Sequence, residues 1–290
     1  MIISNTQLDE KQLQSVETLA ALCQDYDGGI PALYYHLLTQ KRTSENNVLF
    51  LQDEQLIGFL SIYFFYSDAC EVSLLVSPSH RRQGIAKQLL KTILPLLRAK
   101  EIKSLIFSMP SLKDNTWLTQ RGFFYCHSEY QMQRNSYEPI LIPAPNLEIH
   151  KADLSDIPAL CAIDEACFSG QQVDMTTRFQ MLLNDNNYTL MLALHEKKPV
   201  GKAHIHWQEK GAILSDIAIL PQHQGRGWGG EMLAYCINHA LTQGKTKLTL
   251  DVETSNRNAL NLYTRYGFTT INASDFWLIP VDKMAETFQL

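Results

Sequence analysis

The chain has 290 residues, of which 45% are hydrophobic and 19% charged, a globular composition rather than that of a disordered chain. This length favours two domains over a single core. The net charge of −5 lacks the basic excess of nucleic-acid-binding proteins, so nucleic acid is not an expected partner.

Targeting and redox signals indicate a cytoplasmic protein. The segment 1–12 carries Asp9 and Glu10 and has no apolar core, so no signal peptide is expected. The longest apolar run, 56–66, is too short to span a bilayer. The six cysteines are scattered without a C-x-x-C pair, which is typical of reduced thiols. We therefore expect no membrane partner, no disulfide framework and no bound metal.

Periodicity predicts the same order of elements twice. In the first half the expected elements are strands at 48–52, 57–65 and 71–76, a helix at 85–100, a strand at 104–108, a short helix, and a strand ending at 132. A proline-rich linker follows at 136–146. The second half is expected to hold helices at 156–168 and 176–183, strands at 188–195, 200–207 and 212–220, a helix at 231–242, a strand at 247–252, a helix at 256–266, and strands at 268–271 and 276–279.

Two pairs of glycines set the register of an internal duplication. Gly84 and Gly227 lie 143 positions apart, and Gly122 and Gly267 lie 145 apart. Two well-separated landmarks with nearly one offset indicate a repeat. We expect a first domain at 1–137, a linker at 138–146 and a second domain at 147–290.

A glycine-rich loop joins the strand 212–220 to the helix 231–242. Such a loop directs several backbone N–H groups to one place in front of a helix N-terminus, a site suited to a phosphate or pyrophosphate. Glycine allows the tight turn and the close approach to the ligand.

Two nucleotide-binding interpretations of this region are disfavoured. Gly225, Gly227 and Gly230 match G-x-G-x-x-G, but four residues separate the strand from the first glycine, and the first half has no such pattern. A Walker A loop ending at 244–246 is excluded because the position of its leading glycine is His239.

A third pattern fits both halves. The sequence [Q/R]-x-x-G-x-[G/A] occurs at 224–229 and at 81–86, each after a strand and x-x-P. The second half adds N-x-x-A-x-x-x-Y-x-x-x-G-F at 256–268. The chain thereby resembles the GNAT superfamily of N-acetyltransferases in a tandem form, with a layout similar to the mycothiol-synthase type. The resemblance implies an α/β (α+β) fold of two GNAT-like domains, each a mixed, mostly antiparallel twisted sheet flanked by helices.

The resemblance also implies acetyl-CoA as co-substrate and assigns its contacts. Backbone groups at the end of the third strand would run beside the pantetheine arm, one of them polarising the thioester oxygen, and loop amides would hold the pyrophosphate. Asn256 would cap its helix and touch the pantetheine. The residues assigned to the cofactor are Ile217, Ala218, Ile219, Gln224, Gly225, Arg226, Gly227, Trp228, Gly229 and Asn256, with Arg81, Arg82, Gln83, Gly84, Ile85 and Ala86 in the first half.

Catalysis requires an acid for the departing thiolate and a base for the incoming amine. Tyr263 stands at the position of the family tyrosine and is the expected acid. Asp216 and Glu253 are alternative bases, acting directly or through water. In the first half Leu118 and Ser111 stand at the positions of the tyrosine and the asparagine, so that half is expected to be non-catalytic.

The expected reaction is direct attack by a primary amine, on a small molecule or a peptide, at the acetyl group. The helices at 156–183 are expected to line the acceptor site. Their candidate residues are Glu165, Cys167, Phe168 and Asp174. His204 and His206 share a strand face without a third ligand, so a metal site is not expected there. The alternative is a non-catalytic CoA-binding regulatory module, and a dinucleotide oxidoreductase is the disfavoured rival.

Overall fold

The computed structural model describes residues 1–111, 116–168, 174–209 and 211–290, which form two compact units. The first unit is Met1–Tyr130 with Asn272–Leu290, and the second is Gln131–Ile271. The continuous domains expected at 1–137 and 147–290 differ from these units, because the end of the chain lies in the first unit. The expected linker 138–146 is irregular backbone within the second unit.

The first unit contains a sheet in the order β1-β2-β3-β4-β5-β12-β6. Its elements are β1 (Ile2–Asn5), α1 (Glu10–Asp27), α2 (Tyr35–Leu38), β2 (Asn47–Gln52), β3 (Gln55–Tyr63), β4 (Ala69–Val76), η1 (Pro78–His80), α3 (Ile85–Ala99), β5 (Ser104–Pro110), α4 (Thr116–Gln120), the start of β6 (Phe124–Asn135), the end of β12 (Thr269–Pro280) and α9 (Val281–Phe288). All of its recorded ladders are antiparallel except β4 with β5.

The second unit repeats this arrangement in the order β12-β6-β11-β10-β9-β8-β7. Its own elements are β7 (Glu148–Lys151), η2 (Leu154–Asp156), α5 (Ile157–Cys167), α6 (Met175–Asn184), β8 (Tyr188–His195), β9 (Lys198–Gln208), β10 (Gly211–Ile219), η3 (Pro221–His223), α7 (Trp228–Thr242), β11 (Lys247–Glu253) and α8 (Arg257–Arg265). The parallel pair here is β10 with β11. The predicted mixed, mostly antiparallel sheets flanked by helices are therefore confirmed.

The last strand differs from its prediction because its side chains are buried in the core of the first unit. The two short strands expected at 268–271 and 276–279 form one strand, β12, whose Ser274–Pro280 segment pairs antiparallel with β5. Trp277 is 4% exposed and Ile279 is fully buried, and both pack in the core around α3. Because these side chains complete that core, the chain end belongs to the first unit.

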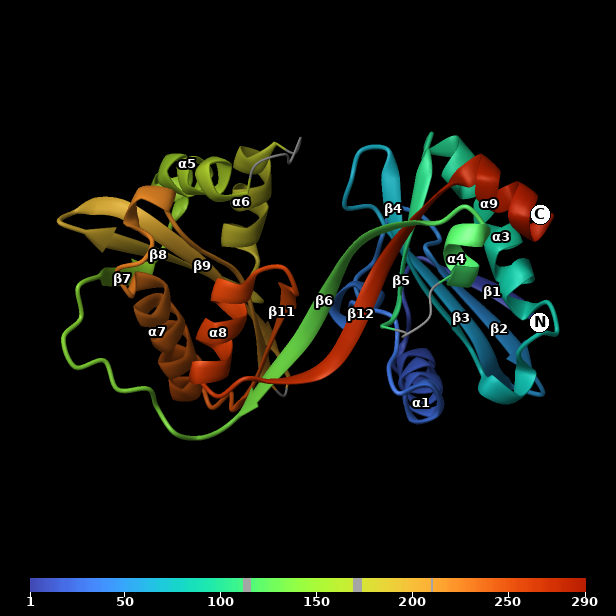
Figure 1. Ribbon diagram of the computed structural model, residues 1–290, viewed down its shortest axis with the longest axis horizontal. Helices are drawn as coiled ribbons and strands as arrows, with labels where there is room; N and C mark the ends of the chain where they lie inside the picture. Colours follow the sequence, from blue (N-terminus) through green and yellow to red (C-terminus); the bar gives the residue numbers. More distant parts are fainter. Residues whose placement is uncertain (112–115, 169–173, 210) are drawn as a thin grey trace. The chain divides into compact units, whose positions relative to one another are not determined.

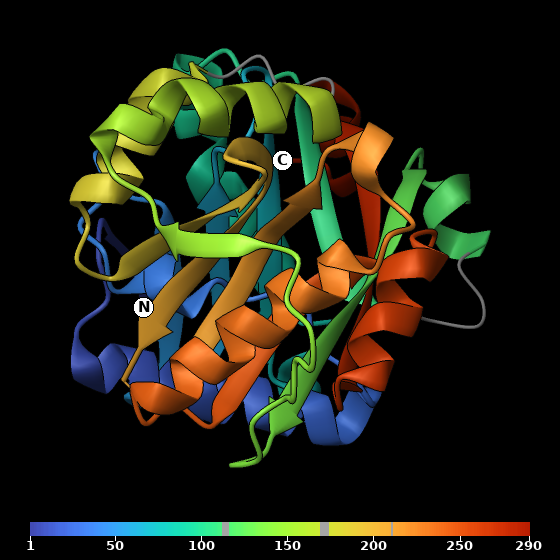
Figure 2. The same cartoon turned by 90° about the vertical axis from the view of Figure 1, so that its left-hand side faces the viewer.

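Side chains alternate between the two faces of the sheet in the second unit, and a different set of helices covers each face. Leu190 and Leu192 on β8 pack with α5 and α6, while α7 buries Met232, Leu233 and Ile237 against the other face. Figure 1 shows α5 and α6 on one side of these strands and α7 on the other, and Figure 2 shows α7 lying along the strands. Within the described residues, no helix is long and apolar enough to cross a membrane.

Candidate functional site

The two glycine loops adopt the same local conformation. In the second unit η3 is followed by left-handed residues at Gly225 (φ 78°) and Gly227 (φ 84°), and Gly227 precedes α7. In the first unit η1 is followed by Arg82 (φ 60°) and Gly84 (φ 80°), and Gly84 precedes α3. The first loop thus keeps its shape although Arg82 is a non-glycine residue in the left-handed region, which costs about 1 kcal/mol.

The loop before α7 has the properties of an anion site. In the described part of the chain, the backbone N–H groups of residues 225–229 donate to no other group. These donors lie at the N-terminus of a helix of 15 residues, where the helix dipole adds partial positive charge. A Cβ built on Gly225 or Gly227 meets nothing within 4 Å, so the glycines serve backbone conformation and ligand access rather than packing.

The side chains of this loop mostly serve the protein itself. Gln224 donates from Nε2 to the carbonyl of Ile219 at 3.0 Å. Trp228 is 5% exposed and lies between the rings of His195 and His223, with centroid distances of 4.4 and 5.2 Å. Gln224 and Trp228 therefore present only backbone groups to a ligand. The guanidinium of Arg226 lies 5.3 Å from the centre of the Trp228 ring.

The first-unit loop is tied to α1. Arg81 donates from Nε to the carbonyl of Val76 at 3.1 Å, as Gln224 does for the corresponding strand end. Its two terminal nitrogens bind Asp27 at 2.7 and 2.6 Å, and its guanidinium covers the ring of Tyr26. The bidentate pair engages the charge that would otherwise face an anion there.

A β-bulge distinguishes β10 from its counterpart β4. The register between β10 and β9 shifts between Ser215 and Ala218, and Asp216 within the bulge has a φ of 50°. The β3–β4 ladder runs without a shift from Gly58↔Val76 to Tyr63↔Glu71. A bulge bends the strand and interrupts its ladder, so it reorients the backbone groups of Ile217 and Ala218.

The two strands beside β10, β11 and β9, accommodate this bulge. The recorded pairing of β10 with β11 covers Gly211–Ile213 and Lys247–Thr249, and beyond it the described part of β10 pairs only with β9. On β9, a Cβ at Gly201 would come within 2.6 Å of the Ala218 carbonyl oxygen, so only glycine permits this approach. The end of β10 thus has a free edge facing β11, where an extended ligand could add as a strand.

Asp216 holds the bulge through buried charges. Its Oδ2 lies 3.1 Å from His204 Nδ1, and its Oδ1 lies 3.9 Å from Lys202 Nζ. Burial alone would raise the pKa of Asp216, but the hydrogen bond from His204 and the positive charges of Lys202 and Arg178 outweigh it and hold the pKa well below its usual range. A carboxylate so stabilised accepts a proton poorly, which argues against the expected role of Asp216 as base and favours a role in positioning the bulge.

Lys202 and Asp164 complete this cluster of buried charges, and neither was predicted from the sequence. Lys202 is fully buried, lies 2.7 Å from Asp164 on α5, and has the rings of Phe168 and Phe179 within 5.0 and 5.4 Å of Nζ. The available signal was the K-x-H-x-H spacing of β9, which places Lys202 on the face shared by the two expected histidines. A charge inside an apolar strand requires a partner, and that partner comes from a distant helix.

The residues of the later motif lie on or beside α8. Asn256 caps that helix by accepting from the Ala259 N–H at 3.1 Å, as expected. Tyr263 is 9% exposed, and burial raises its pKa to about 12. Glu253 is exposed at the end of β11 and accepts from Ser255 at 3.0 Å. In the first unit Leu118 is fully buried in the apolar core.

Comparison with known proteins identifies the family. The model of the acetyltransferase (GNAT) family matches residues 13–123 and 157–268. Each match lies within one compact unit, and together they cover more than half of the chain. The chain belongs to the GNAT acetyltransferase family.

Curated members of the GNAT family resemble only part of this chain. Thialysine N-epsilon-acetyltransferase of Mus musculus is 32% identical over 72 residues, which is 25% of this chain and 42% of that protein. N-alpha-acetyltransferase MAK3 of Arabidopsis thaliana is 33% identical over 81 residues, 27% of this chain and 43% of that protein. The chain thus matches less than half the length of either relative.

Solved structures match the tandem GNAT fold along almost the whole chain. A GCN5-related N-acetyltransferase from Sphaerobacter thermophilus gives a TM-score of 0.76 at 16% identity, covering 97% of this chain and 96% of that one. A tandem GNAT protein from the clavulanic acid biosynthesis pathway gives 0.66 at 14% identity, covering 97% and 98%. At these identities the likeness establishes the fold, and it agrees with the predicted duplication.

The helices expected to line the acceptor site of this GNAT protein are α5 and α6. Cys167 at the end of α5 donates from Sγ to the carbonyl of Ile219 at 3.5 Å, and Glu165 is exposed on the same helix. Phe168 packs against Lys202, and Asp174 caps α6 by accepting from Thr176 and Thr177. The segment 169–173 between the two helices lies outside the described residues.

The buried charges predict a pH dependence of stability. Burial lowers the pKa of His204 below its ordinary 6.5, so at acidic pH the unfolded chain binds a proton that the folded chain resists. The contribution of His204 to the free energy of unfolding is fully present above pH 6.5 and is lost as the pH falls below this value. We expect the melting temperature of His204→Asn to fall less than that of the wild type between one pH unit above and one below 6.5.

A matched control is His150→Asn, which removes a histidine whose side chain is 40% exposed. This variant should leave in place the pH dependence that His204 contributes. Equal slopes of melting temperature against pH in the wild type and in His204→Asn would show that His204 does not contribute.

Proposed function

We propose that the protein is an N-acetyltransferase that moves the acetyl group of acetyl-CoA to a primary amine, with its active site in the second unit. The observation that carries this proposal is the asymmetry of the repeat. The second unit combines an anion-binding loop, a bulged β10 and Tyr263, whereas the first has a regular β4 and Leu118. Screening primary amines for release of the CoA thiol tests the activity.

The geometry suits the two ends of an acetyl-CoA substrate. The free N–H groups at 225–229 suit the pyrophosphate, and Arg226 supplies an exposed positive charge beside them. The free edge of β10 at Ile217, Ala218 and Ile219 suits the amide groups of the pantetheine arm. One N–H of this segment would polarise the thioester oxygen.

The proposed chemistry is a direct transfer. The nitrogen of the neutral amine attacks the thioester carbonyl carbon, the carbon–sulfur bond breaks, and the thiolate takes a proton from the Tyr263 hydroxyl. A pKa of about 12 keeps Tyr263 protonated at neutral pH, as a proton donor requires. Of the two expected bases, Glu253 is favoured because it is exposed and free of the cation cluster that stabilises Asp216. It would accept the amine proton directly or through water.

The class of acceptor is supported by the relatives. One is named an N-epsilon-acetyltransferase of thialysine and the other an N-alpha-acetyltransferase, so the names of the relatives cover both ε- and α-amines. We propose a primary amine on a small molecule or a peptide, bound beside α5 and α6.

The first unit supports the alternative of a non-catalytic CoA-binding module for that half alone. Its loop keeps the left-handed conformations at Arg82 and Gly84, and the N–H groups of residues 82–86 donate to no group in the described chain. The Arg81–Asp27 pair and Leu118 argue against turnover there. Binding without catalysis fits both observations.

Replacement of Gly227 tests the anion loop. Asn and Asp both tolerate a positive φ and have nearly equal volume, so Gly227→Asn and Gly227→Asp differ mainly in charge. We expect Gly227→Asp to bind acetyl-CoA at least about tenfold more weakly than Gly227→Asn, because its carboxylate repels the pyrophosphate. Isothermal titration calorimetry measures both, with NADH as a ligand that should give no heat of binding.

Two results would contradict this assignment. Equal acetyl-CoA affinities of the two folded variants would exclude Gly227 from the pyrophosphate contact. Tight NADH binding without a response to acetyl-CoA would favour the dinucleotide interpretation.

Removal of the Tyr263 hydroxyl tests the acid. We expect Tyr263→Phe to lower kcat by a factor on the order of 10² while leaving the acetyl-CoA affinity nearly unchanged, because only the proton donor is lost. The matched control is Tyr235→Phe on α7, which should keep the wild-type rate. A full rate in Tyr263→Phe would assign the proton to another group.

Disruption of the first loop tests the asymmetry. We expect Gly84→Asp to turn over the acceptor at a rate close to that of the wild type. The first unit has Leu118 where the second has the proposed acid Tyr263, so the loss of its loop should not affect catalysis. Thermal melting of the same sample separates a catalytic loss from a destabilised fold. A folded but inactive Gly84→Asp beside an active Tyr263→Phe would move catalysis to the first unit.

A further inference from the structure

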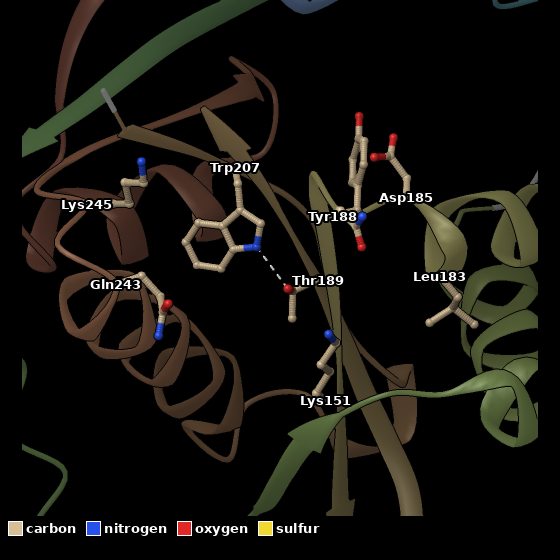
Figure 3. Close-up of a pocket in the computed structure, with 9 residues that line it drawn as sticks. Lys151, Leu183, Asp185, Tyr188, Thr189, Trp207, Gln243 and Lys245 are labelled. Atoms are coloured by element: carbon tan, nitrogen blue, oxygen red, sulfur yellow. Dashed lines mark hydrogen bonds between the residues drawn. The ribbon is translucent and has the colours of Figure 1, made fainter. Parts of the chain in front are cut away.

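A cavity lies in the second unit, at the end of α7 opposite the glycine loop. Its volume is about 360 Å³, within the range of sites for small ligands. It is lined by Lys151, Leu183, Asp185, Asn186, Tyr188, Thr189, Trp207, Gln243 and Lys245 (Figure 3). These residues come from β7, α6, β8, β9 and the two segments that follow α6 and α7.

This cavity is separate from the proposed acetyl-transfer site. Trp207 lies five positions along β9 from Lys202, a distance of roughly 17 Å in a strand. The 15 residues of α7 separate Gly227 from Gln243 by about 22 Å. A ligand in this cavity would therefore not occupy the CoA site.

Two lysines give the cavity a positive character. Lys245 is half-buried and donates from Nζ to the Glu209 carbonyl at 2.8 Å, which fixes its position and leaves two further N–H groups. Lys151 enters from β7, and Figure 3 shows its ammonium group directed towards Thr189. The charge of Lys151 also contributes, after burial, to lowering the pKa of His239 behind Trp207.

The buried hydroxyl of Thr189 is oriented as a hydrogen-bond donor beside Lys151. The indole Nε1 of Trp207 donates to Thr189 Oγ1 at 2.9 Å, and Thr189 is 6% exposed. Within the described residues, no acceptor is recorded for the Thr189 hydroxyl proton. Because Trp207 occupies a lone pair of this oxygen, the remaining donor points away from the indole. Thr189, Lys151 and the Gln243 amide thus offer donors around one space.

The one carboxylate of the lining, Asp185, is already engaged. It accepts the N–H of Asn187 at 2.8 Å in the turn between α6 and β8. Lysines near the end of α7 would also be expected simply to complement the helix dipole. That account fits Lys245, but it does not explain Lys151 on β7 or the oriented Thr189 hydroxyl.

The internal repeat shows that the fold does not require a lysine at the position of Lys245. With the offset of 143 between Gly84 and Gly227, the position of Lys245 corresponds to Ile102 and that of Trp207 to Phe64. Ile102 is 7% exposed and belongs to an apolar core. The first unit therefore has an apolar core residue at the place of Lys245, whereas Gln243 and Thr189 correspond there to the polar residues Lys100 and Asn46.

We propose that this cavity binds the oxyanion of a small metabolite, a carboxylate or a phosphate, between Lys151, Thr189, Gln243 and Lys245. The Trp207 ring and Leu183 form the wall against which the body of that molecule packs. Ordinary carboxylates and phosphates are recognised by such combinations of ammonium, hydroxyl and amide donors.

Nuclear magnetic resonance of the full chain tests the proposal. The indole N–H signal of Trp207, identified by its loss in Trp207→Phe, is followed during titrations with inorganic phosphate and, separately, with acetate at constant ionic strength. We expect a saturable shift with at least one anion, and the stronger response identifies the oxyanion. The shift should persist in the presence of saturating acetyl-CoA, because the two sites are separate.

Matched lysine variants make the test specific. Lys151→Gln should weaken the binding of the anion at least about tenfold, as loss of a charge-assisted contact predicts. Lys198→Gln removes a charge at the other end of β9 and should leave the anion affinity unchanged. Absence of a saturable shift with both anions, or equal weakening in the two variants, would overturn the proposal. Loss of the shift on adding acetyl-CoA would do so as well.

Discussion

The course of the β10 backbone beside its free edge depends on the bulge at Asp216. A β-strand in the middle of a sheet normally pairs on both sides, which would leave no room for a ligand backbone. Here the recorded pairing of β10 with β11 stops at Ile213, and on the other side the bulge at the left-handed Asp216 shifts the pairing with β9, which resumes at Ala218 and Ile219 beside Gly201. A left-handed aspartate is tolerated because its carboxylate is held by His204 and Lys202. Buried ion pairing thus stabilises an irregular backbone that the regular strand β4 does not have.

The duplicated units show how one fold accommodates different polar side chains. Both have the same strand order and the same two left-handed residues before the central helix. In the described chain the loop amides of both units donate to no other group, but in the first unit the arginine of the loop pairs with Asp27 on α1. The polar positions around the two sheets also differ, since Lys245 of the second unit corresponds to Ile102 in the core of the first. The two units therefore retain the backbone geometry and change the side chains, which is the asymmetry on which our proposal of catalysis in the second unit rests.

Helix α7 links the two ligand sites that we propose in the second unit. Its N-terminus presents the free N–H groups of the glycine loop, and the residue after its C-terminus, Gln243, lines the cavity proposed to bind an oxyanion. The body of the helix is buried through residues such as Met232, Leu233 and Ile237. Such a packed helix is rigid, so it keeps the two sites at a set distance.

The sequence alone determined the duplication, the order of most elements, the anion loop and the cap at Asn256, because these depend on local patterns of glycine, periodicity and capping side chains. Only the tertiary structure decided that β12 completes the first unit, because the burial of Trp277 and Ile279 depends on a core built from distant strands. It also decided the environment of Asp216. In the sequence, a carboxylate at a strand end is equally compatible with a general base and with a residue that positions the backbone. Lys202, His204 and Arg178 favour the positioning role of Asp216, and only the folded chain brings them together.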